Sequence, residues 1–179
     1  HSEVCIWKNP VTAMQRTKAL GLLHKTIRNN SAMARMGLPD YLVAMRKPGQ
    51  DANPVTHTPE DFPVSQWQEW ASPVWMDIRQ TNVLNRAGAR EADDEKHIAP
   101  LQLDVIERAL TLWSNPGALV LSPFAGIGSE GFMAIRMGRR FVGAELKPSY
   151  FRIACDNLRK AKTMQGDLFT SAEPESDAE

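Results

Sequence analysis

The sequence predicts an α/β fold whose best-defined part lies in the C-terminal third of the chain. A short apolar run at 118–121 leads into a glycine-rich turn, and a helical pattern follows the turn. A second apolar run, at 140–144, then ends in an acidic residue. A strand, a glycine-rich turn, a helix and a second strand in this order form a βαβ unit of the kind that binds nucleotides at the turn.

The composition excludes several classes of protein. With 179 residues and 42% hydrophobic residues, the chain can bury the core of one domain with a small addition. It contains no apolar run long enough for a membrane span and no signal-peptide pattern at its start. Cys5 and Cys155 are too far apart for a metal-ligand motif or a disulfide framework. We therefore expect a cytoplasmic protein without a metal site.

The charge is unevenly divided along the chain. The formal net charge is zero, yet residues 1–50 hold eight Lys and Arg against two acidic residues, a net charge of +6. Residues 51–100 hold four basic and nine acidic residues, a net charge of −5. A basic segment favours an anionic partner such as nucleic acid, although a solvated basic surface also explains it. The candidate nucleic-acid contacts are Lys8, Arg16, Lys18, Lys25, Arg28 and Arg35.

Residues 1–47 are expected to form two strands around a basic helical segment. Val4–Trp7 combines β-branched and aromatic residues and is ended by Asn-Pro, which predicts a strand. Residues 11–29 are rich in Ala, Leu, Met and Lys and predict helix over part of their length, and Ser31–Met36 a further helical turn. Tyr41–Met45 predicts the second strand.

Residues 48–96 are expected to be irregular, because five of the twelve prolines lie between positions 48 and 73. Residues 97–163 should hold the βαβ unit, and residues 164–179 a flexible acidic tail. The elements expected in this part are a helix at 101–113, a strand at 118–121, the turn at 122–131, a helix at 132–137, a strand at 140–144 and a helix at 149–162.

The turn carries the pattern Gly-x-Gly-x-x-Gly over residues 126–131, and Glu145 stands 17 residues after Gly128 at the end of the second strand. An acidic residue at this place accepts hydrogen bonds from two ribose hydroxyls. Pro123 and Phe124 precede the first glycine, which suits a cofactor without phosphates, such as S-adenosylmethionine. Since little sequence follows the turn, the rest of the sheet must come from upstream, in a permuted order.

At these residues the sequence resembles the beta-class amino-methyltransferases of DNA, which methylate adenine N6 or cytosine N4. Their cofactor motif is a strand followed by Asp-Pro-Phe-x-Gly-x-Gly, and here Ser122 replaces the Asp. Glu145–Tyr150 resembles the acidic motif of the family, and His97–Gln102 resembles the segment that helps hold the methionine end of the cofactor. Ile6–Lys8 and Asp40–Val43 resemble late strands of the family's sheet, and the stretch 67–83 looks like phage and prophage members.

The resemblance implies a Rossmann-like S-adenosylmethionine-dependent methyltransferase fold, with 48–96 as the target-recognition region. S-adenosyl-L-methionine would be the cofactor and double-stranded DNA the substrate. The implied cofactor-binding residues are His97, Pro100, Leu101, Pro123, Phe124, Ala125, Gly126, Gly128, Ser129, Glu145 and Lys147.

The catalytic signature of the family, Asp/Asn/Ser-Pro-Pro-aromatic, does not occur in this sequence. In the family its polar group binds the target amine, and its aromatic ring stacks on the flipped base. The nearest match is Ser72-Pro73-Val74-Trp75, which lacks the second proline and also fits a packed loop. We therefore expect an N-terminal portion to be absent and the sheet to be incomplete. That portion, or a second copy of the chain, would complete the sheet.

Two other functions remain open at this stage. The glycine pattern also suits an enzyme that binds NAD or another nucleotide, and the chain could be a non-catalytic DNA-binding fragment. Gln165, Leu168 and Phe169 lie in a short segment that resembles the peptide by which bacterial DNA-processing proteins bind the sliding clamp. Docking of this segment onto its own domain is the alternative.

Overall fold

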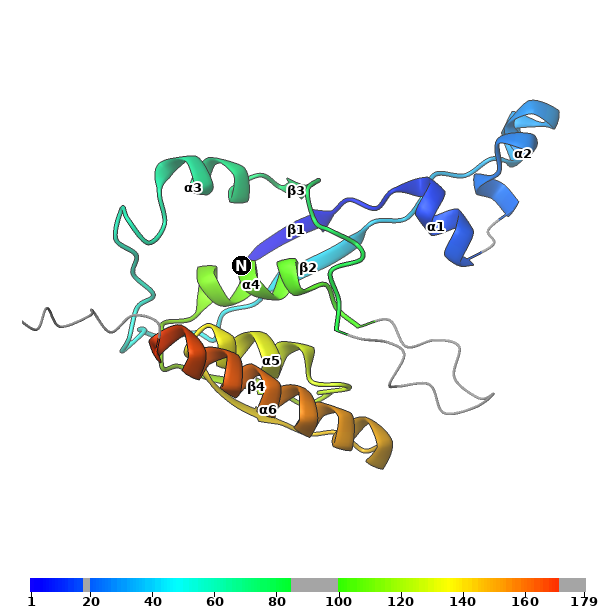
Figure 1. Cartoon of the computed structure of the whole chain (residues 1–179). Helices are drawn as coiled ribbons and strands as arrows, with labels where there is room; N and C mark the ends of the chain where they lie inside the picture. The colour runs from blue at the N-terminus through cyan, green and yellow to red at the C-terminus, as the bar shows by residue number, and fades with distance from the viewer. Residues whose placement is uncertain (18–19, 85–99, 171–179) are drawn as a thin grey trace, which may run out of the picture. The chain divides into compact units, whose positions relative to one another are not determined.

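The computed structural model describes residues 1–17, 20–84 and 100–170, with side chains outside 16–20 and 166–170 (Figure 1). The chain divides into two compact units, residues 1–80 and 81–179. This division falls inside the segment 48–96, which we expected to be a separate region. The difference arises because part of that segment pairs with the sheet of the first unit.

The first unit is built on a three-stranded sheet of order β2-β1-β3. The central strand β1 (Ser2–Ile6) pairs antiparallel with β2 (Asp40–Ala44) and parallel with the short β3 (Val74–Trp75). Val4 and Ile6 are buried, as expected for alternate residues on one face of a half-buried strand. The two predicted strands are thus confirmed.

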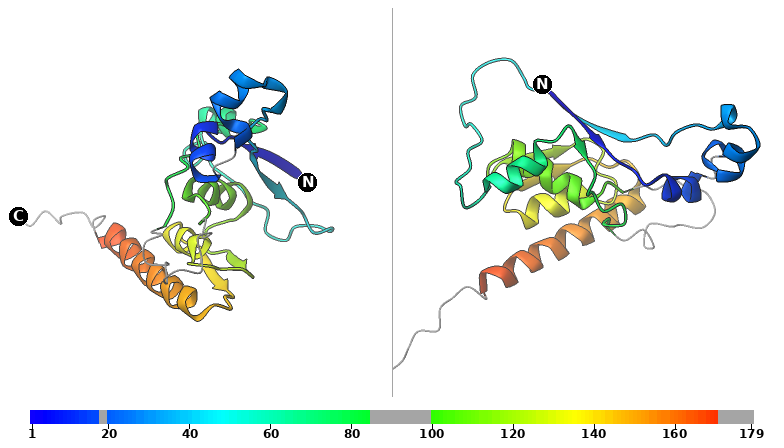
Figure 2. Two further views of the ribbon diagram at one scale, coloured as in Figure 1. Left: turned by 90° about the vertical axis from the view of Figure 1, so that its right-hand side faces the viewer. Right: turned by 90° about the horizontal axis from the view of Figure 1, so that it is seen from above.

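The chain between β1 and β2 forms a helical tip, defined here as residues 10–38. It contains α1 (Pro10–Thr17), η1 (Leu20–Leu22), α2 (His24–Asn29) and η2 (Ser31–Met33). The Asn9 side chain accepts a hydrogen bond of 2.9 Å from the Val11 N–H at the start of α1. Figures 1 and 2 show these helices at the end of the β1–β2 ribbon. The prediction of helix in this segment is confirmed, and its described residues form four short helices.

The proline-rich stretch has no regular structure up to Pro63, as predicted, but α3 (Val64–Trp70) follows it and was not predicted. Residues 64–70 contain neither glycine nor proline, so nothing prevents a helix once Pro63 has set its start. The indole N–H of Trp75 donates a 3.0 Å hydrogen bond to the Trp70 carbonyl, which ties the end of α3 to β3.

The second unit contains the predicted βαβ arrangement. The parallel strands β4 (Leu119–Ser122) and β5 (Arg140–Gly143) are joined by α5 (Ser129–Arg136). Helix α4 (Leu103–Trp113) precedes them, and α6 (Pro148–Thr170) follows and packs along α5 (Figure 2). The core of this unit is a cluster of Leu84, Ile106, Leu110, Ile127, Phe132, Met133, Ala134 and Ala161.

Two boundaries in this unit differ from the predicted ones. Helix α5 begins at Ser129 rather than at 132, directly after the turn. Helix α6 continues to Thr170 rather than ending at 162, since the sequence beyond 162 has no proline before 174. The clamp-like segment 165–169 is therefore helical and does not belong to a flexible tail. Residues 171–179 lie outside the described residues.

The described strands form two separate sheets, one of three strands and one of two. On the two-stranded sheet, Leu119, Leu121 and Val142 are 57%, 68% and 52% exposed. Leu119 and Leu121 alternate along β4 and therefore point to the same side. Exposed apolar residues on one side of a sheet indicate a face that another layer normally covers.

Within the described part of the chain, no helix has both the length and the apolar composition needed to cross a membrane.

Candidate functional site

The glycine-rich turn is held at the carboxyl ends of β4 and β5. The Ala125 N–H donates a 2.8 Å hydrogen bond to the Ala144 carbonyl. The Gly126 N–H donates a 2.8 Å hydrogen bond to Glu145 Oε2, and the Lys147 N–H donates one of 2.9 Å to Oε1 of the same carboxylate. Glu145 therefore joins the turn to the segment that enters α6.

The second and third glycines of the motif are required by packing. Gly128 has φ +83°, a left-handed conformation that other residues rarely adopt, and a Cβ there would lie 3.2 Å from Ala154 of α6. A Cβ on Gly131 would lie 2.6 Å from side-chain atoms of Leu158 and Phe141. These two glycines allow α5 to approach α6 and β5. Packing thus explains two of the three glycines, so the pattern alone does not select a dinucleotide.

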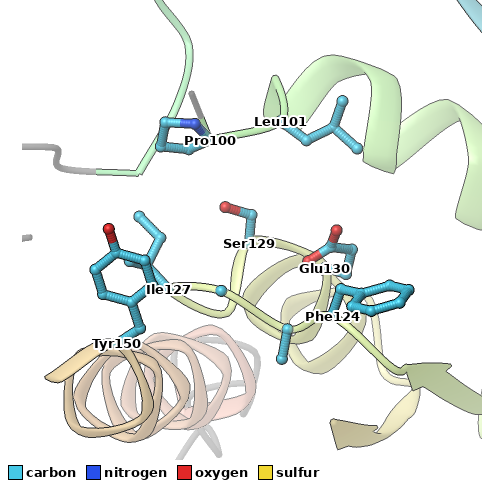
Figure 3. Close-up of a pocket in the computed structure, with 9 residues that line it drawn as sticks. Pro100, Leu101, Phe124, Ile127, Ser129, Glu130 and Tyr150 are labelled. Atoms are coloured by element: carbon cyan, nitrogen blue, oxygen red, sulfur yellow. The ribbon is translucent and has the colours of Figure 1, made fainter. Parts of the chain in front are cut away.

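A cavity of about 220 Å³ opens at the turn (Figure 3). The turn and the first residues of α5 form one wall, Tyr150 of α6 stands at one end beside Ile127, and Pro100-Leu101 faces them from another segment. Its nine lining residues are Pro100, Leu101, Phe124, Ala125, Gly126, Ile127, Ser129, Glu130 and Tyr150. Six of them, all but Ile127, Glu130 and Tyr150, are among the predicted cofactor-binding residues.

Four other predicted cofactor-binding residues do not line this cavity. Gly128 lies against Ala154, and the carboxylate of Glu145 binds backbone N–H groups beside the cavity. The Lys147 ammonium lies 4.5 Å from the centre of the ring of Tyr150, a lining residue, without itself lining the cavity. Pro123 is also outside the lining, and His97 lies outside the described residues.

Ile127, Glu130 and Tyr150 were missed by sequence reasoning. Glu130 and Tyr150 belong to the first turns of α5 and α6, which follow the parallel strands β4 and β5. Helices that follow parallel strands start at the same edge of the sheet, so their first turns face that edge. This rule could have identified both residues, and Ile127 could have been found as a residue of the turn itself.

Glu130 lies in a partly buried, weakly polar environment. Burial raises the pKa of its carboxyl group above the ordinary value, and a hydrogen bond from its own backbone lowers the pKa by a smaller amount. Among the described residues, no group of three or more His, Cys, Asp or Glu side chains could hold a metal ion. The cavity thus offers apolar walls, a hydroxyl, a phenol and one carboxylate.

The weak catalytic candidates Ser72, Pro73 and Trp75 have structural roles, which corrects that expectation. Trp75 is 1% exposed, so its ring has no free face on which a base could stack. The Pro73 carbonyl accepts a 2.9 Å hydrogen bond from the Cys5 N–H of β1. The Ser72 hydroxyl donates to the Val74 carbonyl at 2.9 Å. This tetrapeptide extends the sheet of the first unit.

The predicted DNA-binding residues differ in their availability. Lys25, Arg28 and Arg35 are exposed on the helical tip. The Lys8 ammonium instead forms an ion pair of 2.5 Å with Asp40, which makes it a poorer candidate for a phosphate contact. The side chain of Arg16, and Lys18 as a whole, lie outside the described residues.

Comparison with known proteins gives a family match and several relatives. The sequence model of a family described as DNA methylase matches residues 6–156. The type II methyltransferase M1.MboII of Moraxella bovis is 41% identical over 54 residues, which are 30% of this chain and 21% of that protein. The DNA adenine methyltransferase YhdJ of Escherichia coli is 35% identical over 79 residues, 43% of this chain and 27% of that protein.

Solved structures show the same fold. A protein of Thermus thermophilus described as a DNA modification methylase, complexed with S-adenosyl-L-methionine, superimposes with a TM-score of 0.61 and 23% identity. The match covers 90% of this chain and 53% of that one. A further structure of the Thermus protein gives a TM-score of 0.56 at 25% identity, over 89% of this chain and 66% of the other. The present chain thus spans about a quarter of these curated relatives and half to two thirds of the solved ones.

Proposed function

The chain belongs to the DNA methylase family, and on that premise we propose that it provides the S-adenosylmethionine-binding half of a DNA amino-methyltransferase that acts on adenine N6 or cytosine N4. The observation that carries this proposal is the cavity at the glycine-rich turn, because six implied cofactor-binding residues from separate parts of the family match meet there. The Thermus relative, which has the same fold, is complexed with this cofactor.

The residues present fit this cofactor. The Glu145 carboxylate accepts one hydrogen bond on each oxygen and keeps further lone pairs for two ribose hydroxyls. The cavity of about 220 Å³ is smaller than the roughly 300–1,000 Å³ typical of sites that enclose a drug-sized ligand. It therefore encloses only one end of the cofactor, and Glu145, beside it, is available for the other end.

The chemistry of the proposed reaction needs little from the protein beyond binding and positioning. Bound S-adenosylmethionine supplies the methyl group: the exocyclic amine forms a bond to that carbon, the bond from carbon to sulfur breaks, and a proton passes to solvent. The chain's own residues hold the donor in place and exclude water from one side of it. No described residue matches the Pro-Pro-aromatic motif that would hold the target base.

A further polypeptide segment is proposed to cover the exposed face of the β4–β5 sheet. Leu119, Leu121 and Val142 expose apolar side chains there, and an apolar sheet face is stable only against another layer. The segment would carry the missing catalytic motif and would come from the same protein or from a second copy. This arrangement would place a target-binding group beside the cofactor.

Double-stranded DNA is the proposed substrate, and the helical tip is its proposed contact. Lys25, Arg28 and Arg35 are exposed there, in the quarter of the chain that carries a net charge of +6. Lys and Arg side chains bind phosphates without reading sequence, so this surface would position the DNA. The protein is proposed to act in the cytoplasm, where bacterial DNA is accessible.

A sliding clamp is a separate proposed partner, through Gln165, Leu168 and Phe169. Because these residues lie on the last turns of α6, binding as an extended peptide would require those turns to unwind. Helix ends open at little cost, so the proposal is physically reasonable. Loss of clamp capture in a Phe169→Ala variant would support it, and equal capture would contradict it.

Calorimetry with S-adenosylmethionine and with NAD tests the cofactor. We expect the first ligand to bind and the second to give no heat, and binding of NAD alone would overturn the proposal. Methyl transfer from labelled cofactor to DNA, with this chain and with an upstream-extended form, tests the reaction. If the extended form binds the cofactor but never labels DNA, the chain is part of a non-catalytic DNA-binding protein.

A further inference from the structure

A charged side chain lines the cavity at the turn and has no part in the proposed function so far. Of the nine lining residues in the described part of the chain, Glu130 alone carries a charge. Figure 3 shows its carboxylate and the Ser129 hydroxyl at the start of α5, on the side that faces Pro100 and Leu101. The other lining residues are apolar, glycine, or neutral hydroxyl-bearing side chains.

The Glu130 carboxylate lies in a cavity whose other described lining residues are uncharged. Burial raises the pKa of Glu130, so its charged form is disfavoured by its surroundings. None of the lining residues that the structure describes is a cation that could compensate the charge. Ser122, which stands where the resembled motif has an Asp, is 8% exposed and uncharged, so it supplies no second carboxylate. A cationic ligand group would compensate Glu130 and form a charge-assisted hydrogen bond.

We propose that the Glu130 carboxylate is the binding subsite for the α-ammonium group at the methionine end of S-adenosylmethionine. The inference rests on the proposed function. The cofactor has two cationic groups, the sulfonium and the ammonium. Only the ammonium carries N–H donors, and a carboxylate is an acceptor, so the two form directional hydrogen bonds. The sulfonium has no hydrogen to donate, and its methyl group must remain open to the target amine.

The test compares two ligands and three variants of the full chain by calorimetry. 5′-Methylthioadenosine shares the adenosine of the cofactor but has no amino acid. We expect Glu130→Gln to lower the affinity for S-adenosylmethionine at least tenfold, because charge-assisted hydrogen bonds are stronger than neutral ones. The affinity for 5′-methylthioadenosine should change by no more than twofold. Glu145→Ala should lower the affinity for both ligands. The matched control Glu107→Gln, an exposed carboxylate on α4, should change neither.

The outcomes separate the inference from the proposed function. If the wild-type chain binds no S-adenosylmethionine, both are overturned. If it binds, and Glu130→Gln binds equally well, the ammonium subsite is overturned while the proposed function stands. If Glu130→Gln lowers the affinity for both ligands to the same degree, Glu130 maintains the conformation of the turn, and the ammonium subsite is again overturned.

A measurement on the wild-type chain covers the case in which the variant does not fold. The ratio of the affinities for S-adenosylmethionine and 5′-methylthioadenosine should fall several-fold as the pH drops and Glu130 takes up a proton. Glu130 and Tyr150 are the two titratable side chains among the described residues that line the cavity. A ratio that stays constant from neutral pH to about pH 4 would contradict the subsite.

Discussion

At the scale of single residues, two carboxylates near the turn differ in their surroundings and so in their roles. The Glu145 carboxylate accepts hydrogen bonds from the backbone N–H groups of Gly126 and Lys147. Glu130 lies in a mostly apolar cavity, where burial raises its pKa. Glu145 thus shapes the turn and keeps lone pairs for a ligand, whereas the proposed role of Glu130 lies in ligand binding alone.

Replacing Glu145 by Ala should make the turn less rigid and should also weaken the binding of the cofactor. Without the carboxylate, the Gly126 and Lys147 N–H groups lose their acceptor. Hydrogen exchange of these two amides should speed up by about tenfold or more, since each loses a bond to a charged group. Exchange of the α4 amides serves as the internal control. Unchanged exchange at Gly126 would show that the turn holds its shape by other contacts.

Replacing Glu130 by Gln should stabilise the ligand-free protein at neutral pH. Because the pKa of Glu130 is raised in the folded state, folding favours its protonated form, and ionisation above the unfolded pKa costs stability. The stability lost through this group should therefore be regained as the pH falls below its folded pKa. Glu107→Gln is the control in thermal denaturation. A lower melting temperature for Glu130→Gln would mean that the favourable interaction of the charge with the N-terminus of α5 outweighs its burial.

At the scale of elements, Arg139 joins the ends of two helices. Its guanidinium donates hydrogen bonds of 2.6 Å to the Met137 carbonyl after α5 and 2.7 Å to the Ser114 carbonyl after α4. A third bond, of 3.3 Å, reaches the Leu110 carbonyl. A cation at helix C-termini is favourable, and the carbonyls there need partners from outside the helix. Arg139 therefore holds α4 and α5 in register.

Arg139→Met should lower the free energy of unfolding by about 3 kcal/mol, since several bonds to a charged donor are lost, among them those to the Met137 and Ser114 carbonyls. Chemical denaturation measures the change. The control is Arg159→Met, which removes an exposed ion pair with Asp156 on α6 and should cost no more than about 0.5 kcal/mol. Equal effects of the two variants would show that the Arg139 bonds contribute no more than a surface pair.

At the scale of the whole molecule, a net charge of zero conceals the basic helical tip. Lys25, Arg28 and Arg35 are exposed residues of the helical tip. The helices of the tip lie at the end of the β1–β2 ribbon (Figure 1). Long-range attraction to DNA depends on such local charge and not on the sum over the chain.

Each of Lys25→Ala, Arg28→Ala and Arg35→Ala should weaken DNA binding without regard to sequence. The plot of log K against log salt concentration has a negative slope, and its magnitude should decrease by about 0.9 for each phosphate contact removed. Fluorescence anisotropy over a salt series measures this slope. Lys160→Ala, an exposed charge on α6 of the other unit, is the control. An unchanged slope in all three tip variants would contradict the proposed DNA contact.

The sequence by itself determined the parts of this protein that depend on neighbours along the chain. An apolar run, a glycine-rich turn and a second apolar run ending at Glu145 specify the β4–α5–β5 unit, because hydrophobic periodicity and backbone conformation are local properties. The same local motif identified the family, whose model matches residues 6–156. It also predicted four of the nine cavity residues, and the segment 97–102 predicted two more.

The tertiary structure alone decided what depends on contacts between distant residues. It buried Trp75, whose strand pairs with β1, and so left its ring no free face for a base. It used the Glu145 carboxylate to hold Gly126, 19 residues away, and it brought Tyr150 and Pro100 to the same cavity as Glu130. Burial, and therefore the pKa of Glu130 and its availability to a ligand, follows from packing in space, which local sequence patterns do not encode.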